Sequence, residues 1–304
     1  MRYTFLAAVA LVIGTHPVWA QPMFTAGVDL VRFGVTVIDR DGHFVTDLTE
    51  DDFELYEEDA RQTLSYFVGA NGGEAPPPLH LGLLLDTSAS MLKDLRLART
   101  AAIKFLNTMR QAEDMTLVDF DTEVRVGRYG QIDFPRLIER IREQKPKGWT
   151  ALYDALGVYL HGASAQDGQK ILVLYTDGTD TRSEMSYNEM LELVKASDVT
   201  MYAIGFLKGR LGNAQLMQRV RVLVEATGGE VFFPMTADPL DGIYERIAEE
   251  IAARYSFGYV STDMRTDGRW REVEIKLISS RPELRGATIR TRRGYYGRHT
   301  PPAS

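Results

Sequence analysis

Hard oxygen donors gather in three short segments of the chain. Asp86, Ser88 and Ser90 alternate in the first segment, so their side chains can point the same way, and Thr150 and Asp177 stand in the other two. Carboxylate and hydroxyl oxygens without His or Cys suit Mg²⁺, Mn²⁺ or Ca²⁺ rather than zinc. The five residues are therefore a candidate site for a divalent cation.

Each of these segments adjoins an element that the hydrophobic pattern predicts. The apolar runs 81–85 and 171–176 end next to the two aspartates and are typical of strands buried on both faces. A helix is expected over 151–163, directly after the threonine. Loops that follow parallel strands meet at the carboxyl edge of a sheet. We therefore expect the five side chains to meet there, with Gly148 and Gly178 letting the backbone bend close to an ion.

The rest of the central region continues the alternation of strands and helices. Strands are expected over 81–85, 116–120, 124–129, 171–176, 200–206 and 230–233. Helices are expected over 92–109, 134–141, 151–163, 187–196, 214–227 and 240–255. This pattern predicts a doubly wound α/β fold, with a mainly parallel sheet covered by helices on both faces and 124–129 as an edge strand.

The five candidate ligands match the metal-site signature of a known family. Asp86, Ser88 and Ser90 fit the form Asp-x-Ser-x-Ser, and a separate Thr (Thr150) and a separate Asp (Asp177) complete it. The chain thus resembles the von Willebrand factor A (VWA) family over residues 81–253. The resemblance implies a Rossmann-like fold and a metal-ion-dependent adhesion site, with Mg²⁺ as the expected ion. It also implies that the hydroxyls contact the metal, that the aspartates act mostly through water or hydrogen bonds, and that a partner Asp or Glu completes the shell.

The flanking segments are β-rich. Strands are expected over 29–38, 53–57 and 63–67 before the central region, and over 255–260, 271–278 and 288–292 after it. These flanks resemble exported bacterial, notably acidobacterial, VWA-related proteins, and the resemblance implies that they pair into one small β-domain. The expected organisation is a signal peptide (1–20), an N-terminal β-segment (21–68), a Gly- and Pro-rich linker (69–79), the VWA domain (80–254), a C-terminal β-segment (255–298) and a tail (299–304).

The first residues indicate export. Arg2 precedes an apolar run over 5–14, and Ala20 ends a stretch that resembles a cleavage site, which would leave Gln21 as the mature N-terminus. The run is short for a membrane span, although an uncleaved anchor is the alternative. We expect no transmembrane segment in the mature chain and a periplasmic or secreted location.

Composition excludes several classes of function. The formal net charge of −7 argues against non-specific nucleic-acid binding, and the basic stretch 281–298 is interpreted as a solvated strand face. The chain has no cysteine, so disulfides and cysteine nucleophiles are excluded.

Plainer interpretations exist for individual residues. Either aspartate of the metal set could be a helix cap, although five matching residues together favour a metal site. Asp121, Asp180 and the acidic run 57–59 are interpreted as solvated loop or turn residues. The side chain of Trp149 could lie exposed at the rim of the site or pack inside.

Three functions follow from this set of residues. The first is a non-enzymatic module that binds a protein partner through the cation. The second is a structural domain in which the ion only fastens loops together. The third and weakest is a metal-assisted hydrolase, because no general base stands near the set. The identity of the partner and the oligomeric state cannot be predicted from the sequence.

Overall fold

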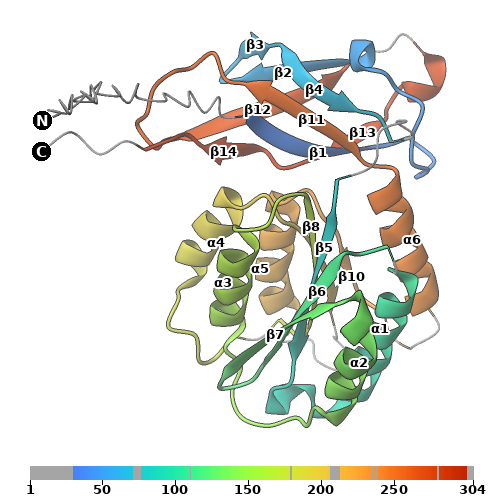
Figure 1. Ribbon diagram of the computed structural model, residues 1–304, viewed down its shortest axis with the longest axis vertical. Coiled ribbons are helices and arrows are strands. Elements are labelled where there is room, and N and C mark those ends of the chain that lie inside the picture. Colours follow the sequence, from blue (N-terminus) through green and yellow to red (C-terminus); the bar gives the residue numbers. More distant parts are fainter. Residues whose placement is uncertain are drawn as a thin grey trace, which may run out of the picture.

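The computed structural model describes residues 30–70, 77–109, 111–178, 180–205, 213–234, 236, 239–278 and 281–299. The expected signal peptide, most of the expected linker and most of the tail lie outside these residues. Two units are visible, a helix-flanked sheet and a smaller β-domain above it (Figure 1).

The helix-flanked unit is built on a sheet of six strands in the order β10-β9-β8-β5-β6-β7. Its strands are β5 (Leu79–Asp86), β6 (Asp114–Phe120), β7 (Val124–Gly130), β8 (Gln169–Thr176), β9 (Thr200–Gly205) and β10 (Val231–Phe232). All neighbours are parallel except β7, which pairs antiparallel with β6 at the edge. The predicted fold class and edge strand are confirmed.

Helices cover both faces of this sheet, so the mainly apolar inner strands are almost completely buried. One face carries α1 (Leu95–Thr108), α2 (Phe134–Glu143) and α6 (Leu240–Ala252), and the other carries α3 (Leu152–Ala163), α4 (Tyr187–Ala196) and α5 (Asn213–Ala226) (Figure 1). The first helix begins later than expected, because residues Ala89–Lys93 form a 3-10 turn, η2, that buries Met91.

The β-domain consists of two four-stranded sheets. Their orders are β13-β1-β11-β4 and β14-β12-β2-β3. The strands are β1 (Leu30–Ile38), β2 (Phe53–Glu57), β3 (Ala60–Gln62), β4 (Leu64–Val68), β11 (Tyr255–Val260), β12 (Trp270–Leu277), β13 (Thr288–Arg290) and β14 (Gly294–Tyr296). Both sheets combine N- and C-terminal strands, with β1 paired to β11 and β13 in one and β2 paired to β12 in the other, so the predicted pairing of the flanks is confirmed. Both sheets contribute to one apolar core, in which the rings of Phe53 and Phe257 lie 4.8 Å apart.

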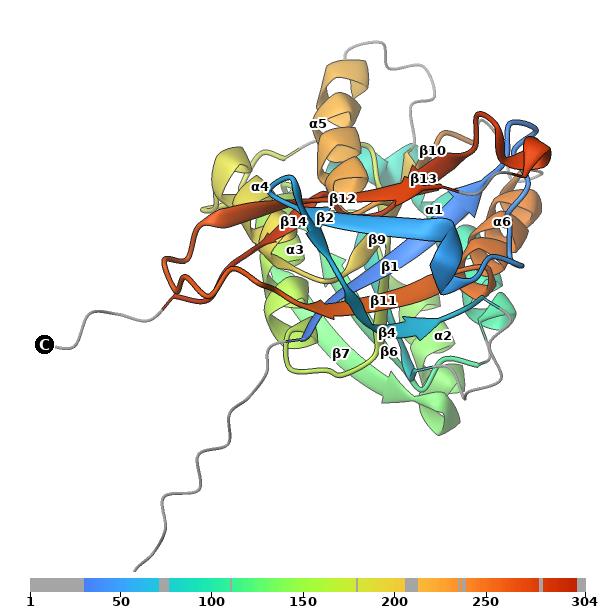
Figure 2. The same ribbon diagram turned by 90° about the horizontal axis from the view of Figure 1, so that it is seen from above.

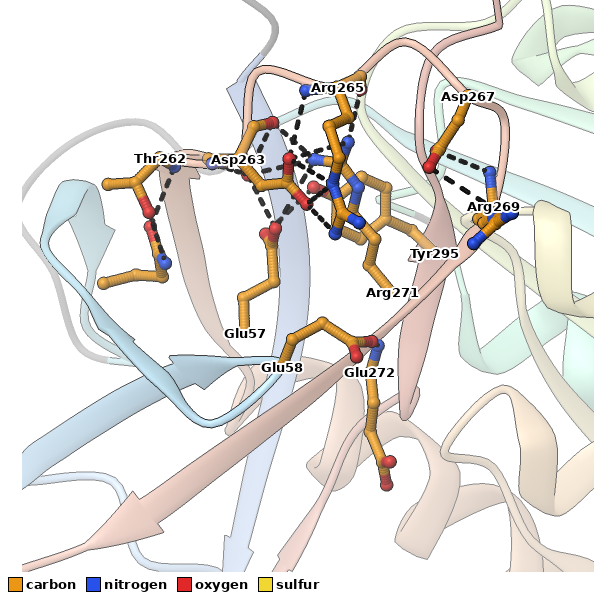
Figure 3. Close-up of polar contacts among 12 residues, drawn as sticks. Glu57, Glu58, Thr262, Asp263, Arg265, Asp267, Arg269, Arg271, Glu272 and Tyr295 are labelled. Atoms are coloured by element: carbon orange, nitrogen blue, oxygen red, sulfur yellow. Dashed lines mark hydrogen bonds and ion pairs between the residues drawn. The ribbon is translucent and has the colours of Figure 1, made fainter.

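A buried polar cluster links the two ends of the chain inside this β-domain (Figure 3). Glu57 is 2% exposed, and its carboxylate accepts hydrogen bonds from Tyr259 (2.6 Å), Tyr295 (3.0 Å) and Ser261 (2.6 Å) and pairs with Arg271 at 3.4 Å. The prediction of a solvated turn is therefore wrong for this residue. Its partners lie some two hundred positions away in sequence, where a local pattern does not reach.

The β-domain lies against the amino-terminal ends of the central strands, and Figure 2 shows it from above, lying across that edge. Ion pairs cross between the units, with Nη1 of Arg290 at 2.9 Å from Glu230 and 3.3 Å from Glu250. The carboxyl-terminal edge of the sheet, where the candidate ligands stand, is the opposite end of the molecule. Among the described residues, no helix is long and apolar enough to cross a membrane.

Candidate metal-binding site

The two candidate carboxylates stand at the ends of adjacent parallel strands. Leu85 of β5 is in register with Tyr175 of β8, so Asp86 lies beside Thr176. The Thr176 Oγ1 hydroxyl donates a 2.8 Å hydrogen bond to Asp86 Oδ2. Asp177 follows directly, and both aspartates are 0% exposed. The sheet register therefore places the two carboxylates at the same edge, as the sequence predicted.

The loop after β5 folds back on its own side chains. The Ser88 backbone N–H donates to Asp86 Oδ1 at 2.9 Å, and the hydroxyl oxygens of Ser88 and Ser90 lie 2.9 Å apart. The alternating spacing thus brings two hydroxyls together above a buried carboxylate. Neither aspartate of the set caps a helix, since the residues preceding η2, α1 and α4 are Ser88, Asp94 and Ser186 respectively. The helix-cap interpretation is therefore not supported.

The segment that carries Thr150 is wedged among the other loops of this edge. The Lys147 N–H donates to the Thr87 carbonyl at 2.9 Å, and the Gly148 carbonyl accepts from Ala89 at 3.2 Å. The Thr150 backbone bonds to the loop after β8, donating to Thr181 Oγ1 at 3.0 Å. Thr150 is only 2% exposed, so it is buried among these loops.

Two glycines shape these loops as the sequence suggested. Gly148 has φ +68° and Gly178 has φ +84°, conformations that other residues rarely adopt. A Cβ at Gly148 would collide with Thr122 Oγ1, the atom that accepts the Trp149 N–H at 2.9 Å. The close approach of the two loops therefore depends on glycine at this position.

The buried carboxylates make this edge electrostatically unfavourable by itself. Burial raises the pKa of Asp86 to about 7, and the negative charge of Asp177 adds to the rise, while hydrogen bonds from Ser88 and Thr176 oppose it. A divalent cation would offset the negative charge of the two buried carboxylates. The donor set, two carboxylates with hydroxyls and no nitrogen or sulfur, fits a hard cation such as Mg²⁺. In the described part of the chain, no group of three or more His, Cys, Asp or Glu gathers as a candidate metal site.

An ion-pair network beside the site was missed by sequence reasoning. Arg125 of β7 bridges Asp119 (2.5 Å) and Asp121 (2.8 Å), and its Nη2 lies 3.4 Å from Thr87 Oγ1. Arg140 of α2 also pairs with Asp119, at 2.6 Å. Asp121 is 2% exposed, so its interpretation as a solvated residue is wrong. The hydrogen bonds to Asp121 from Arg125 and Glu123, with the charges of Arg125 and Lys147, lower its pKa although burial opposes the change.

The remaining rim residues are one structural residue, Asp180, and two exposed residues, Trp149 and Leu92. Asp180 is half-buried, and its Oδ1 accepts from the Leu152 N–H at 2.9 Å and from the Ser183 hydroxyl at 2.6 Å, so it serves the start of α3. Trp149 is 64% exposed and Leu92, on η2, is 70% exposed. The rim interpretation of the tryptophan is therefore favoured over packing.

Comparison with known proteins identifies the family. The model of the von Willebrand factor type A domain matches residues 80–246, from the second residue of β5 into α6. The chain belongs to the von Willebrand factor type A domain family. All five candidate ligands of this VWA domain lie inside the matched range. No curated protein matches the chain.

Solved structures resemble this chain at low sequence identity. A mutant of the PilB minor pilin of Streptococcus sanguinis is 14% identical, with a TM-score of 0.50, covering 72% of this chain and 88% of that one. A von Willebrand factor type A protein of Catenulispora acidiphila is 12% identical (TM-score 0.48), covering 92% and 76%. The vWF domain of the type V pili tip protein Mfa5 of Porphyromonas gingivalis is 14% identical (TM-score 0.49), covering 59% and 96%.

Proposed function

We propose that this protein is an exported, non-enzymatic binding module that captures a protein partner through a divalent cation, Mg²⁺ by preference. The residues proposed to hold the cation are Asp86, Ser88, Ser90, Thr150 and Asp177. The observation that carries the proposal is the fully buried Asp86 carboxylate. It lies beside a second buried carboxylate, and no ion pair to a basic residue is recorded for it among the described residues.

In this proposal the five residues divide into three hydroxyl ligands and two aspartates that act mostly through water or hydrogen bonds. Ser88, Ser90 and Thr150 supply hydroxyl oxygens, while Asp86 keeps the first loop in place through its bonds to the Ser88 N–H and to Thr176. A partner Asp or Glu would add the remaining oxygen ligand. The exposed Trp149 and Leu92 would then stand at the border of the contact. The cation would attract the carboxylate of the partner, and the loops of this chain would hold the other ligands in position.

Isothermal titration calorimetry of residues 21–304 with Mg²⁺, Mn²⁺ and Ca²⁺ tests the cation site. One ion should bind the wild-type protein, and none should bind Asp86→Ala. The matched control is Asp241→Ala, which removes an exposed carboxylate on α6 and should leave cation binding unchanged. Equal binding by wild type and Asp86→Ala would refute the proposed ligand set.

A second measurement separates partner capture from a purely structural ion. Water-proton relaxation of the Mn²⁺-loaded protein reports water that exchanges at the bound ion. An adhesion-type site keeps an open position, so relaxation should be enhanced and should fall when acetate or an Asp-containing peptide is added. An ion that only fastens loops would show no exchangeable water, although removing it would still lower the melting temperature.

A further inference from the structure

A second site candidate lies between the two units, at the end of the molecule opposite the proposed cation site. It is a cleft of about 640 Å³, bounded by β1 and β11 on one side and by the starts of β8 and β9 on the other. Five cationic side chains line it: Arg32, Lys170, Arg254, Arg292 and Arg298. Among the described residues two carboxylates also line it, and one of these, Asp198, forms an ion pair with Lys170 at 2.6 Å. The cleft is thus strongly positive in a protein whose net charge is −7.

Arg254 is buried at this cleft without full compensation. It is 8% exposed, and its Nε has no hydrogen-bond partner among the described residues. Gly34 of β1 leaves the space for it, since a Cβ there would collide with that nitrogen. The nearby carboxylate of Glu250 feels the charge of Arg254, but the ion pair recorded for Glu250 is with Arg290. No ion pair is recorded for Arg254 itself in the part of the chain that the structure describes.

Arg292 also lines this cleft, and its Nε likewise has no hydrogen-bond partner among the described residues. Its Cζ lies 4.5 Å from the centre of the Phe33 ring, and its terminal nitrogens donate to the backbone carbonyls of Ser197 (3.2 Å) and Arg32 (2.7 Å). Its Nε is buried without a partner, and burial lowers its pKa. Again, no carboxylate pairs with it among the described residues. The sequence suggested a solvated basic strand for 281–298, and that interpretation holds only in part at this residue, which is half-buried with its Nε fully buried.

The buried Arg254 and the half-buried Arg292 each keep a buried Nε atom without a hydrogen-bond partner among the described residues, which is energetically costly because a buried charge is normally paired. An anion that enters the cleft would offset this cost, and guanidinium groups are suited to carboxylate and phosphate oxygens. Tyr66 and Tyr295, which are half-buried, also line the cleft and offer apolar ring faces. A volume of this size is in the range of small-molecule sites.

We propose that the cleft binds a small organic oxyanion, a carboxylate or a phosphate carried on a ring or short apolar body. Its charged group would face Arg254 and Arg292, and its apolar body would lie against the aromatic side chains. Because the walls come from both units, the bound molecule would also hold the β-domain against the VWA domain. This site does not depend on the proposed cation site.

Calorimetry with four probes tests the proposal on residues 21–304. Phenyl phosphate and benzoate carry both the charge and the ring, inorganic phosphate carries only the charge, and phenol carries only the ring. At physiological salt, which screens weak surface attraction, one saturable site is expected for phenyl phosphate or benzoate, whichever oxyanion the cleft prefers. Phenol should bind much more weakly, and the preferred probe should raise the melting temperature.

Two variants and a control assign the binding to the cleft. Arg254→Gln should weaken the preferred probe by about tenfold or more. Arg32→Gln changes an exposed cleft residue, so it should fold normally and weaken binding to a smaller extent. Arg281→Gln removes an arginine of the β-domain that pairs with Asp47 away from the cleft, and should bind as wild type.

Three outcomes would overturn the proposal. They are the absence of saturable binding for every anionic probe at millimolar concentration, equal affinity for phenol and phenyl phosphate, and wild-type affinity in both cleft variants. Chelating divalent cations should leave the binding unchanged, which separates this site from the proposed cation site at the other end of the sheet.

Discussion

The Thr176 hydroxyl donates a 2.8 Å hydrogen bond to Oδ2 of Asp86 across two adjacent parallel strands. This bond fixes one oxygen of a fully buried carboxylate, and the Ser88 N–H fixes the other at 2.9 Å. The carboxylate is thereby held in one orientation before any ligand arrives. Its charge nevertheless remains unfavourable, since hydrogen bonds only partly oppose the effect of burial on its pKa.

Replacing Asp86 with Asn should stabilise the metal-free protein at alkaline pH. The pKa of Asp86 is about 7 in the folded protein, above its ordinary value of 3.8. The resulting destabilisation is complete above pH 7 and fades as the pH falls from 7 towards 4, because the folded state then takes up a proton that the unfolded state does not. Each unit of pKa shift corresponds to about 1.4 kcal/mol, so a gain of a few kcal/mol is expected.

Urea unfolding in the presence of EDTA at pH 5 and pH 8 measures this effect. The stability difference between Asp86→Asn and wild type should be larger at pH 8 than at pH 5, while Asp241→Asn should show no such dependence. A variant that is less stable than wild type at pH 8 would mean that the carboxylate is already compensated in the metal-free protein.

Ser88→Ala should weaken cation binding without unfolding the domain. The Ser88 hydroxyl lies 2.9 Å from Ser90 Oγ and also hydrogen-bonds the Asp86 carboxylate, so the folded state loses two local contacts while the backbone bond from the Ser88 N–H to Asp86 is kept. Loss of one hydroxyl ligand is expected to reduce cation affinity by about 10- to 100-fold. Calorimetry with Mg²⁺ and Mn²⁺ checks this, with Ser164→Ala, an exposed serine after α3, as the control. Unchanged affinity would remove Ser88 from the ligand set.

The sequence predicted where the residues of the proposed cation site lie because the determinants of their placement are local. Asp86, Ser88 and Ser90 occupy one loop, and the apolar runs before Asp86 and Asp177 are long enough to identify buried parallel strands. Strand order then brings the loops to one edge. The burial of Asp86 and Asp177, and hence the raised pKa of Asp86, follows from that placement rather than from the residues alone.

Other parts of the molecule could not be predicted in this way, because their partners are distant in sequence. The sequence around Glu57 predicts an acidic turn. In the structure, Tyr259 and Arg271, which are distant in sequence, contact its buried carboxylate. The sequence places Arg292 among several basic residues that the pattern predicts to be solvated. In the structure, it donates a hydrogen bond to the carbonyl of Ser197 in the VWA domain. A sequence pattern predicts that a charged residue is solvated whenever the residues that bury it are distant in the chain.

Arg125→Met should destabilise the VWA domain. The substitution leaves the buried Asp121 with only Lys147 at 3.8 Å, and it takes one of two arginines away from Asp119. Removing one partner of a buried ion pair costs about 3 kcal/mol or more. Urea unfolding measures the loss, and Arg136→Met on the exposed face of α2 should stay within about 0.5 kcal/mol of wild type. If the two variants were equally stable, the network would be of no consequence for folding.

Glu57→Ala should selectively weaken the β-domain. The change leaves the buried Arg271 and the hydroxyls of Tyr259 and Tyr295 without their shared acceptor, at a cost of about 3 kcal/mol or more. Trp270 of β12 reports on this domain, since its ring contacts Tyr296 at 5.2 Å. Its fluorescence in a Trp149→Phe background of residues 21–304, which lack Trp19, should show unfolding at lower urea than in the matched protein with Glu57 intact. Glu274→Ala, an exposed position on β12, is the control.

Trp149→Ala should separate cation binding from partner binding. The side chain is 64% exposed. The Trp149 backbone N–H donates a 2.9 Å hydrogen bond to Thr122 Oγ1, and the substitution preserves this bond. Thr150 should therefore remain in place, and Mg²⁺ affinity measured by calorimetry should stay within about twofold of wild type, a difference of about 0.4 kcal/mol. Binding of an Asp-containing peptide to the cation-loaded protein should weaken, since an exposed aromatic beside the site offers apolar contact area to a partner. An equal loss of both affinities would instead show that the tryptophan supports the loop, and that the contact surface lies elsewhere on this edge.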